Sequence, residues 1–373
     1  MDDIKERLRV LDRLEPPDLR ARLGTHSLEP PPRRPSARVA VAFLAVVVAA
    51  VGIGIAYLAL QGTTRPAVPS VVPALHPNGP IWFLGDHGAG PGSIFGPSGL
   101  YSVAPDGTGL VKVSLPDRLY SITGLAVSPD GRLVAMSNGG GEFPPRNLYV
   151  MRPDGSGLRQ ITRGSYYDVT PAWSPDGAEI VFSSDRCCAT DRGLSGYALY
   201  TVGQDGSGLR QLTSDSASDL APAWSPDGSR VAYVQMPGNS ARGAIWVISA
   251  DGSDPRKLTD DSRHVDAVTW SPDARELAYI SHLGDGVDWE IRVLRPDGSD
   301  LHTVYTCTTP CANGGYTLAW SPDGSEIAFW FGGPAGYESH PTIGVVGVDG
   351  SGFHVVDTHG VGACCLSWIP ARR

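Results

Sequence analysis

The sequence predicts an all-β fold: a six-bladed β-propeller, closed by pairing of its C-terminal strand with the first blade and preceded by a single transmembrane helix. Two observations predict this. A tetrapeptide recurs through the chain at the interval of a propeller blade, and an uncharged apolar run lies near the N-terminus. The composition agrees, because 46 Gly and 32 Pro among 373 residues are typical of many short strands joined by tight turns.

The apolar run occupies residues 39–60 and contains one weakly polar residue, Tyr57. As a helix it would be about 33 Å long, enough to cross a hydrocarbon core of roughly 30 Å. Several arginines precede the run and only Arg65 follows it closely, so the positive-inside rule predicts a cytoplasmic tail over residues 1–38. The alternative is a cleaved signal peptide, which would have a shorter apolar core and a small-residue cleavage site that residues 56–59 lack.

Residues 61–79 carry four prolines and are predicted to form an extended stalk below a propeller of residues 80–370. The expected location is the bacterial plasma membrane, crossed once by residues 39–60, with the N-terminus cytoplasmic and the propeller outside. The first 38 residues contain nine Lys/Arg and seven Asp/Glu, whereas the remainder contains 21 and 32. An acidic outer domain argues against a nucleic-acid partner, because phosphate backbones are bound by basic surfaces.

The repeated tetrapeptide is Ser-Pro-Asp-Gly, and each copy is followed by a short apolar strand. Its copies begin at Ser128, Ser174, Ser225 and Ser321, with a near copy, Ser-Pro-Asp-Ala, at Ser271. The intervals of 46, 51, 46 and 50 residues each match one blade. Pro presets the second position of a turn and Gly tolerates the left-handed conformation, so each copy predicts a tight turn between two strands.

A second turn, Asp-Gly, occurs once in each predicted blade. Its copies begin at Asp106, Asp154, Asp205, Asp251, Asp297 and Asp349. Six of these turns against five of the first leave an unmatched strand at each end of the domain, Ile81–Leu84 and Leu366–Pro370. The sequence therefore predicts that the last strand supplies the inner strand of the first blade and closes the ring.

The pattern Pro-Ala-Trp-Ser-Pro-Asp-Gly, an apolar strand, Leu-Tyr-x-Val, Asp-Gly-Ser-Gly and Leu-Arg-Gln-Leu-Thr resembles the TolB-like, WD-repeat-like propellers of bacteria. The resemblance covers about residues 80–369. It implies the propeller fold, and binding scaffolds, lyases and accessory domains of peptidases all share that fold. TolB proteins carry an α/β domain before the propeller, where this sequence has the predicted anchor and stalk.

Both repeated turns are expected on one face of the propeller and the irregular loops on the other. The irregular loops are residues 85–99, 138–146, 184–196, 236–243, 282–289 and 332–341. Variable loops on a rigid scaffold commonly carry binding sites, so this face is predicted to bind a protein, a peptide or an envelope glycan. Unselected drift of surface loops is the alternative.

All six cysteines map to the loop-bearing face, and an even number outside the membrane favours disulfides. They are Cys187, Cys188, Cys307, Cys311, Cys364 and Cys365. Cys307 and Cys311 form the easiest local bridge, and Cys364 or Cys365 could reach it from the next blade. Cys187 and Cys188 are compatible with a vicinal bridge or with free thiols, so the connectivity stays open.

Histidines and acids on the same face are the candidate ligand-binding residues. They are Asp168, Asp219, Asp266, His264, His282 and His340. His87 and His359 are expected on the same face. Convergent His and Asp could bind a divalent metal, but their separation in the sequence gives no ligand spacing. The sequence therefore assigns no metal, no cofactor and no catalytic residue.

Two further patterns have competing interpretations. Trp173, Trp224, Trp270, Trp320 and Trp368 occupy one repeat position, and packing between blades is favoured over an aromatic cage. Residues 251–254 and 297–300 faintly resemble calcium loops, but they lack the remaining ligands and fit hairpin turns better.

No catalytic signature is present: the sequence has no Gly-x-Ser-x-Gly, His-Glu-x-x-His or phosphate-binding Gly-Lys loop. The favoured function is a membrane-anchored, non-enzymatic recognition or scaffold module. One alternative is a transmembrane sensor or anti-sigma-like regulator, because the predicted cytoplasmic tail resembles those that precede the anchor in actinobacterial anti-sigma-like proteins. The tail has apolar Ile4, Leu8, Leu11 and Leu14 at helical spacing, but it contains no Cys and so lacks the zinc-binding motif of those proteins. Another is a propeller lyase or hydrolase with a metal at the channel mouth.

Overall fold

The computed structural model describes residues 78–86, 99–117, 119, 122–139, 145–187, 196–214, 217–238, 242–260, 262–282, 288–307, 317–331 and 342–370. The predicted cytoplasmic tail, transmembrane helix and nearly all of the stalk lie outside these residues. Within the described ranges, no helix has the length and apolar character to span a membrane.

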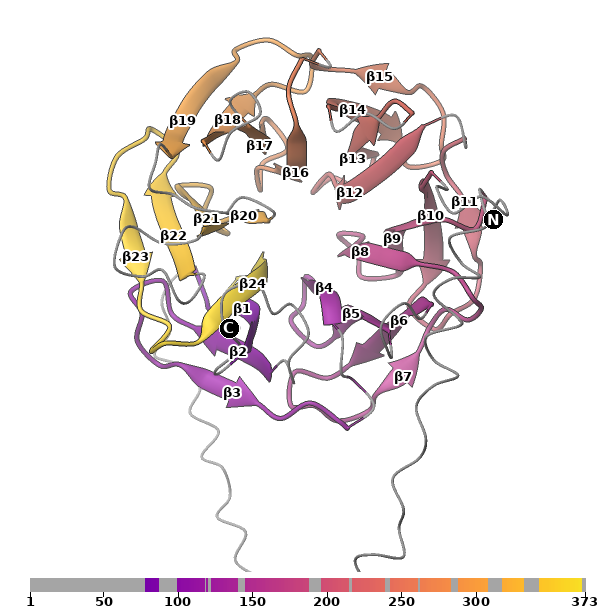
Figure 1. Cartoon of the computed structure of the whole chain (residues 1–373), viewed down its shortest axis with the longest axis horizontal. Helices are drawn as coiled ribbons and strands as arrows, with labels where there is room; N and C mark the ends of the chain where they lie inside the picture. The colour runs from indigo at the N-terminus through magenta and orange to yellow at the C-terminus, as the bar shows by residue number, and fades with distance from the viewer. Residues whose placement is uncertain are drawn as a thin grey trace, which may run out of the picture. The chain divides into compact units, whose positions relative to one another are not determined.

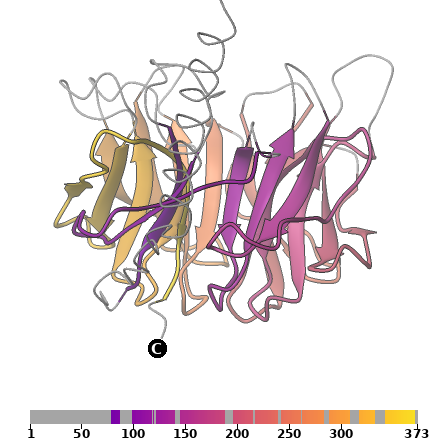
Figure 2. The same cartoon turned by 90° about the horizontal axis from the view of Figure 1, so that it is seen from below.

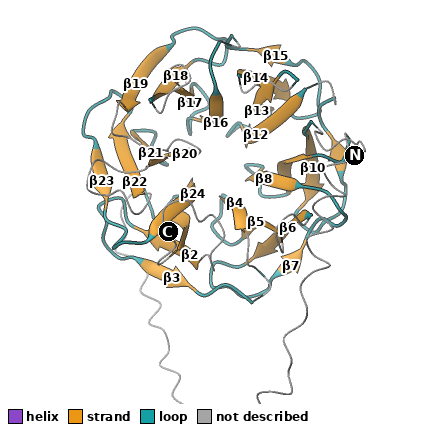
Figure 3. Ribbon diagram, in the orientation of Figure 1, coloured by secondary structure: helices purple, strands orange, loops and turns teal. Residues whose placement is uncertain are grey.

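The described chain forms six four-stranded antiparallel sheets arranged as blades around a common axis (Figure 1). From the axis outward, blade 1 contains β24 (Gly362–Trp368), β1 (Ile81–Asp86), β2 (Gly99–Val103) and β3 (Val111–Val113), and blade 2 contains β4 (Ile122–Val127), β5 (Val134–Gly139), β6 (Arg146–Met151) and β7 (Arg159–Gln160). Blade 3 contains β8 (Asp168–Trp173), β9 (Glu179–Ser184), β10 (Ala198–Gly203) and β11 (Arg210–Gln211), and blade 4 contains β12 (Ser218–Trp224), β13 (Arg230–Met236), β14 (Ala244–Ser249) and β15 (Arg256–Lys257). Blade 5 contains β16 (Val265–Trp270), β17 (Leu277–His282), β18 (Trp289–Leu294) and β19 (His302–Cys307), and blade 6 contains β20 (Leu318–Trp320), β21 (Glu326–Phe331), β22 (Thr342–Gly347) and β23 (His354–Val356). Every regular element of the described residues is a strand (Figure 3). The predicted six-bladed, all-β architecture is confirmed.

Ring closure is also as predicted. The final strand β24 lies beside β1 in an antiparallel pair, with Ile81 opposite Trp368 and Trp82 opposite Ser367 (Figure 1). Strands from opposite ends of the propeller therefore form one sheet, in which β24 pairs the inner edge of β1.

The hydrophobic core lies between neighbouring blades. One buried cluster joins β1 and β24 of blade 1 to blade 6 and includes Ile81, Trp368, Ala328 and Ile343. The repeated tryptophans belong to these interfaces, which favours packing over a cage. The indole N–H of Trp173 donates to the carbonyl of Ala126 in blade 2 at 3.1 Å, so it bridges two blades.

The strands run roughly along the axis of the ring, so their ends form two faces (Figure 2). We call the face with the Ser-Pro-Asp-Gly and Asp-Gly turns the turn face. The opposite face, where each inner strand begins and each second strand ends, is the loop face.

Turn-face side chains are used to build the turns. In the first Ser-Pro-Asp-Gly copy, Ser128 Oγ donates to Asp130 Oδ1 at 2.7 Å and accepts from the amide of Leu133 at 2.9 Å. The amide of Gly131 donates to the carbonyl of Ser128 at 2.7 Å. The same bonds recur at Ser174, Ser225, Ser271 and Ser321.

The Asp-Gly turns are equally self-contained, because each aspartate accepts the amide hydrogen of the residue two positions later. Hydrogen bonds from the side chains of Ser156, Ser207, Ser253, Ser299 and Ser351 are the largest cause of the lowered pKa of the aspartate in five of them. Residues 251–254 and 297–300 are among these turns, so they form hairpin turns, the interpretation that the sequence favours over calcium loops.

The divergent tetrapeptide in blade 5 places an alanine where the other copies have glycine. Ala274 adopts φ 60°, close to the φ 70° of Gly177 in blade 3. A β-carbon disfavours this left-handed conformation by roughly 1–2 kcal/mol. We expect Ala274→Gly to raise the free energy of unfolding by about 1 kcal/mol in chemical denaturation, after subtracting the greater entropy of an unfolded glycine.

Gly177→Ala is the matched reverse substitution. An added β-carbon at Gly177 meets no atom within 4 Å, so only the backbone conformation changes in energy. Its unfolding free energy should fall by about the same amount. Equal stability of both variants with the parent protein would contradict the left-handed turn geometry.

Candidate functional site at the channel mouth

The inner strands begin irregularly at the loop face. Register shifts interrupt the pairing of β4, β8, β12, β16 and β24 with their neighbours. Three residues at one repeat position, Thr170, Ala221 and Cys365, have φ between 49° and 53°. Bulges and left-handed non-glycine residues are concentrated at functional sites, so these features make the channel mouth the candidate functional site.

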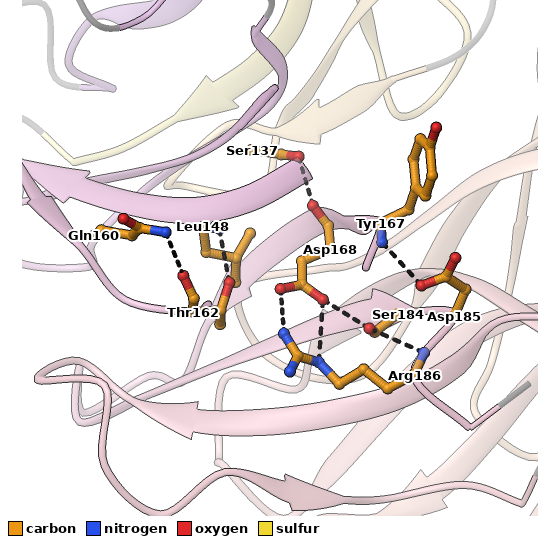
Figure 4. Close-up of polar contacts among 9 residues, drawn as sticks. All are labelled: Ser137, Leu148, Gln160, Thr162, Tyr167, Asp168, Ser184, Asp185 and Arg186. Carbon is orange, nitrogen blue, oxygen red and sulfur yellow. Dashed lines mark hydrogen bonds and ion pairs between the residues drawn. The ribbon is translucent and has the colours of Figure 1, made fainter. Parts of the chain in front are cut away.

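Asp168 begins β8 and is fully buried. Its Oδ1 accepts from Ser184 Oγ at 2.6 Å and from Arg186 Nε at 3.2 Å, while Oδ2 pairs with Arg186 Nη2 (Figure 4). The main-chain carbonyl of Asp168 accepts from Ser137 Oγ of blade 2 at 2.6 Å (Figure 4). The carboxylate is thus held by a two-pronged guanidinium contact and neutralised within its own blade.

Arg186 is fixed on its other side by aromatic rings. Its guanidinium carbon lies 4.8 Å from the ring centre of Tyr166 and 5.8 Å from that of Phe182. Nearby, Asp185 Oδ1 accepts the amide hydrogen of Tyr167 at 2.8 Å, which ties the crossover into β8 to the end of β9 (Figure 4). The described polar groups at this end of blade 3 are therefore held in place by one another and by the neighbouring rings.

Asp219 holds the same repeat position in blade 4 but has a different environment. Its Oδ1 accepts from Gln235 Nε2 at 2.9 Å, and Oδ2 accepts no hydrogen bond of normal geometry within the described part of the chain. Burial raises the pKa of Asp219 to about 6, with the Thr213 and Gln235 side chains opposing the shift. Among the described residues, no ion pair to Asp219 takes the place of the Arg186 contact in blade 3.

Asp266 in blade 5 is the third acid, and it contacts two of the predicted histidines. Its Oδ1 lies 3.2 Å from His264 Nε2, and its Oδ2 contacts His282 Nε2. Asp266 comes one residue later in its repeat than Asp168 and Asp219 do. It therefore pairs with His282, whereas the earlier acids pair with Ser184 and Gln235 at the preceding position of the second strand.

The structure thus brings His264, Asp266 and His282 together, and keeps Asp168 and Asp219 in separate networks of their own blades. His359 is exposed in a turn, 3.8 Å from Asp357. His340 and His87 lie outside the described residues, as do Cys188, Cys311 and the side chain of Cys364. Cys187 packs against the core beside blade 3, and Cys307 is buried beside blade 6. Because three of the six cysteine side chains lie outside the described residues, the predicted disulfide pairing stays a prediction.

Residues that sequence reasoning missed complete the site. Ser184 and Gln235 lie ten residues after the serine of their tetrapeptides, a repeat offset that could have marked them as partners of Asp168 and Asp219. Arg263 pairs with Glu290 at 3.0 Å beside the histidines, and no sequence pattern signals that contact.

Comparisons with known proteins agree with this fold. No family model matches the chain. Dipeptidyl-peptidase 5 of Porphyromonas gingivalis is 39% identical over 70 residues, which are 18% of this chain and 10% of that protein. The Tol-Pal system protein TolB of Anaeromyxobacter dehalogenans is 42% identical over 52 residues, which are 14% of this chain and 10% of that protein. The chain therefore matches about a tenth of the length of each relative.

Solved structures of TolB proteins share the architecture. A putative TolB from Agrobacterium tumefaciens has a TM-score of 0.54 at 23% identity, with 68% of this chain and 86% of that chain covered. TolB from Acinetobacter baumannii has a TM-score of 0.60 at 15% identity, with 79% and 68% covered. The propeller is TolB-like in fold, as its repeat pattern implies.

Breaking the Asp168–Arg186 pair tests how firmly the channel mouth is built. Arg186→Met leaves a buried carboxylate without its counter-charge, so the free energy of unfolding should fall by about 3–5 kcal/mol. The double variant Asp168→Asn, Arg186→Met should lose less than the two single variants together, as measured by denaturation of all four proteins. The exposed pair Asp130–Arg132 is the control, and Arg132→Met should change stability by less than about 0.5 kcal/mol.

Asp219 should make stability depend on pH. Its folded pKa of about 6 lies above the ordinary carboxyl value of 3.8, so the folded state binds a proton more tightly than the unfolded state. The contribution of this group is therefore most favourable below about pH 4 and is lost as the pH rises through 6. Asp219→Asn should raise the free energy of unfolding at pH 7.5 by roughly 1–2 kcal/mol, and by much less at pH 4.5.

Asp205 provides the opposite control, because the side-chain hydrogen bond of Ser207 lowers its pKa. Asp205→Asn should remove stability at pH 7.5, and this loss should shrink as the pH falls below 3.8. An equal stability gain for Asp219→Asn at pH 7.5 and at pH 4.5 would show that Asp219 does not titrate as described.

Proposed function

We propose that this chain is a membrane-anchored recognition module that binds a protein, a peptide or an envelope glycan on the loop face of an extracytoplasmic propeller. Binding, rather than chemistry on the bound molecule, is the function that the described residues support best. The TolB-like fold is compatible with a protein-binding scaffold, and the name of one relative places that protein in the Tol-Pal system.

The contrast between the two faces carries the proposal. On the turn face, the repeated Ser and Asp side chains are used up in near-identical hydrogen bonds inside each turn. At the loop-face end of the inner strands, blades 3, 4 and 5 contain three different polar arrangements, around the buried Asp168 and Asp219 and around Asp266, whose partner His264 is partly exposed. A fold needs repeated contacts for its stability, whereas blade-specific polar groups on one face are the expected feature of recognition.

Two described arginines at the loop-face ends of blades 2 and 3 are also held in place by their neighbours. Arg186 is clamped between Asp168 and two aromatic rings, and Arg146 Nη1 donates to Thr123 Oγ1 at 3.0 Å within blade 2. Side chains fixed before binding lose little conformational entropy when a partner arrives, which favours specific recognition.

The proposed anchor rests on the sequence. Residues 39–60 are uncharged and long enough to span a bilayer, and the arginines before them favour a cytoplasmic N-terminus. This arrangement would hold the acidic propeller outside the plasma membrane, where a nucleic-acid partner is absent and envelope proteins and glycans are abundant.

Site-specific photo-cross-linking in intact cells tests the proposal. A photoreactive amino acid in place of Tyr166, which lies beside Arg186 on the loop face, should give a discrete adduct. The same amino acid in place of Arg132, which is exposed on the turn face, should give none. Digestion of the adduct with a protease or with a wall-degrading glycosidase then distinguishes a polypeptide from a glycan.

Equal adducts from the two faces, or none from either, would contradict recognition by the loop face. Cleavage of envelope polysaccharide by the purified protein would replace recognition with an enzymatic function. External protease should remove the propeller from spheroplasts while an N-terminal epitope stays protected, and loss of that epitope would contradict the proposed orientation.

A further inference from the structure

Three metal-ligating side chains converge at the loop face of blade 5. His264 lies directly before β16, Asp266 is the second residue of β16, and His282 is the last residue of β17. One ligand atom from each lies within 4.8 Å of the others. Although distant in sequence, they meet because β16 and β17 are neighbouring antiparallel strands.

The backbone sets the two imidazoles side by side. The amide of His282 donates to the carbonyl of His264 at 2.9 Å, and the two rings stack with centres 4.9 Å apart and planes 27° apart. Both Nε2 atoms face the carboxylate of Asp266, one toward each oxygen. Two nitrogens and a carboxylate thus point at a common place, held by a rigid strand pair.

The charge around Asp266 differs from that around Asp168. Asp168 is neutralised by Arg186, whereas the side-chain contacts of the Asp266 carboxylate among the described residues are with His264 and His282. Arg263, the nearest cation along the chain, pairs with Glu290 instead. Among the described residues, no lysine or arginine therefore pairs with the Asp266 carboxylate.

We propose that His264, Asp266 and His282 form a binding site for a divalent transition-metal ion. The two Nε2 atoms and one carboxylate oxygen would be its ligands, a set of two imidazoles and one carboxylate that leaves coordination positions open. The side chain of His264 is 35% exposed, so solvent or a group of a bound molecule can reach those positions. The side chains of Asp266 and His282 are 8% and 14% exposed and form the sheltered side of the site.

The ligand types indicate which ions fit. Imidazole suits Zn²⁺, Co²⁺, Ni²⁺ and Fe²⁺, whereas Ca²⁺ and Mg²⁺ prefer shells made of oxygen. Affinity should therefore follow the order Zn²⁺ above Co²⁺ above Mn²⁺, with no measurable competition from Ca²⁺ or Mg²⁺. The site goes beyond the proposed recognition function and does not depend on the identity of a partner.

Titration of the full-length chain with Co²⁺ and Zn²⁺ tests the site. The protein is purified in detergent without a polyhistidine tag and stripped with a chelator. Co²⁺ should bind with one equivalent and give visible d–d absorption, and Zn²⁺ should displace it. Asp266→Asn, which preserves shape, and His282→Ala should each weaken binding by about 100-fold or more.

His302→Ala is the matched control, because His302 is exposed on β19 and contacts the carbonyl of Asp300 rather than the cluster. It should bind Co²⁺ as the parent chain does. Thermal unfolding without metal shows whether each variant is folded, and Asp266→Asn keeps the test valid if His282→Ala is not. Absence of one-equivalent binding, binding unaffected by Asp266→Asn, or the intense near-ultraviolet bands of cobalt–thiolate bonds would overturn the proposal.

Discussion

The pairing of β24 with β1 is the contact on which the rest of the propeller depends. A blade buries both faces of its sheet against neighbours, so blade 1 needs its inner strand to complete the interfaces on both of its sides. The cluster between blades 6 and 1 contains Leu366 and Trp368 of β24, and the cluster between blades 1 and 2 contains Ile369 just beyond it. Without β24, two core interfaces would lose part of their apolar surface and β1 would present an open edge.

A closed ring also explains how the channel mouth can carry groups that are unfavourable elsewhere. A buried carboxylate with an unpartnered oxygen, such as Asp219, and left-handed residues, such as Thr170 and Ala221, each cost free energy. The repeated turns and the packing between blades supply the stability that tolerates them. Blade 5 shows how a small change in sequence alters this site. Asp266 lies one residue later in its repeat than Asp168 and Asp219, and it contacts two histidines instead of a serine or a glutamine of the second strand.

Much of the fold could be predicted from the sequence, because short motifs, chiefly the repeated turns, determine the local structure of each blade. The Ser-Pro-Asp-Gly turns determine their own hydrogen bonds, and the unmatched strands at the two ends imply closure. The site was less predictable, since His264 and His282 are 18 positions apart and meet only through the register of β16 and β17. Spacing along the chain carries no sign of that meeting, and the metal ligands proposed here were not assigned from sequence. Arg186 was missed for a related reason, because its role depends on the side-chain direction at the end of β9.

Closure of the ring by pairing of β24 with β1 has a consequence for the order in which the chain can fold. The outer strands of blade 1 come first in the domain, but their inner strand, β24, is the last strand of the propeller to be made. Contacts of such large sequence separation form slowly, and they cannot form at all before the final blade has emerged from the ribosome. Until β24 is made, β1 can pair with β2 on one side, and its other edge stays open. Chaperones or early partners that cover the β1 edge during this interval would have a direct effect on the yield of closed rings.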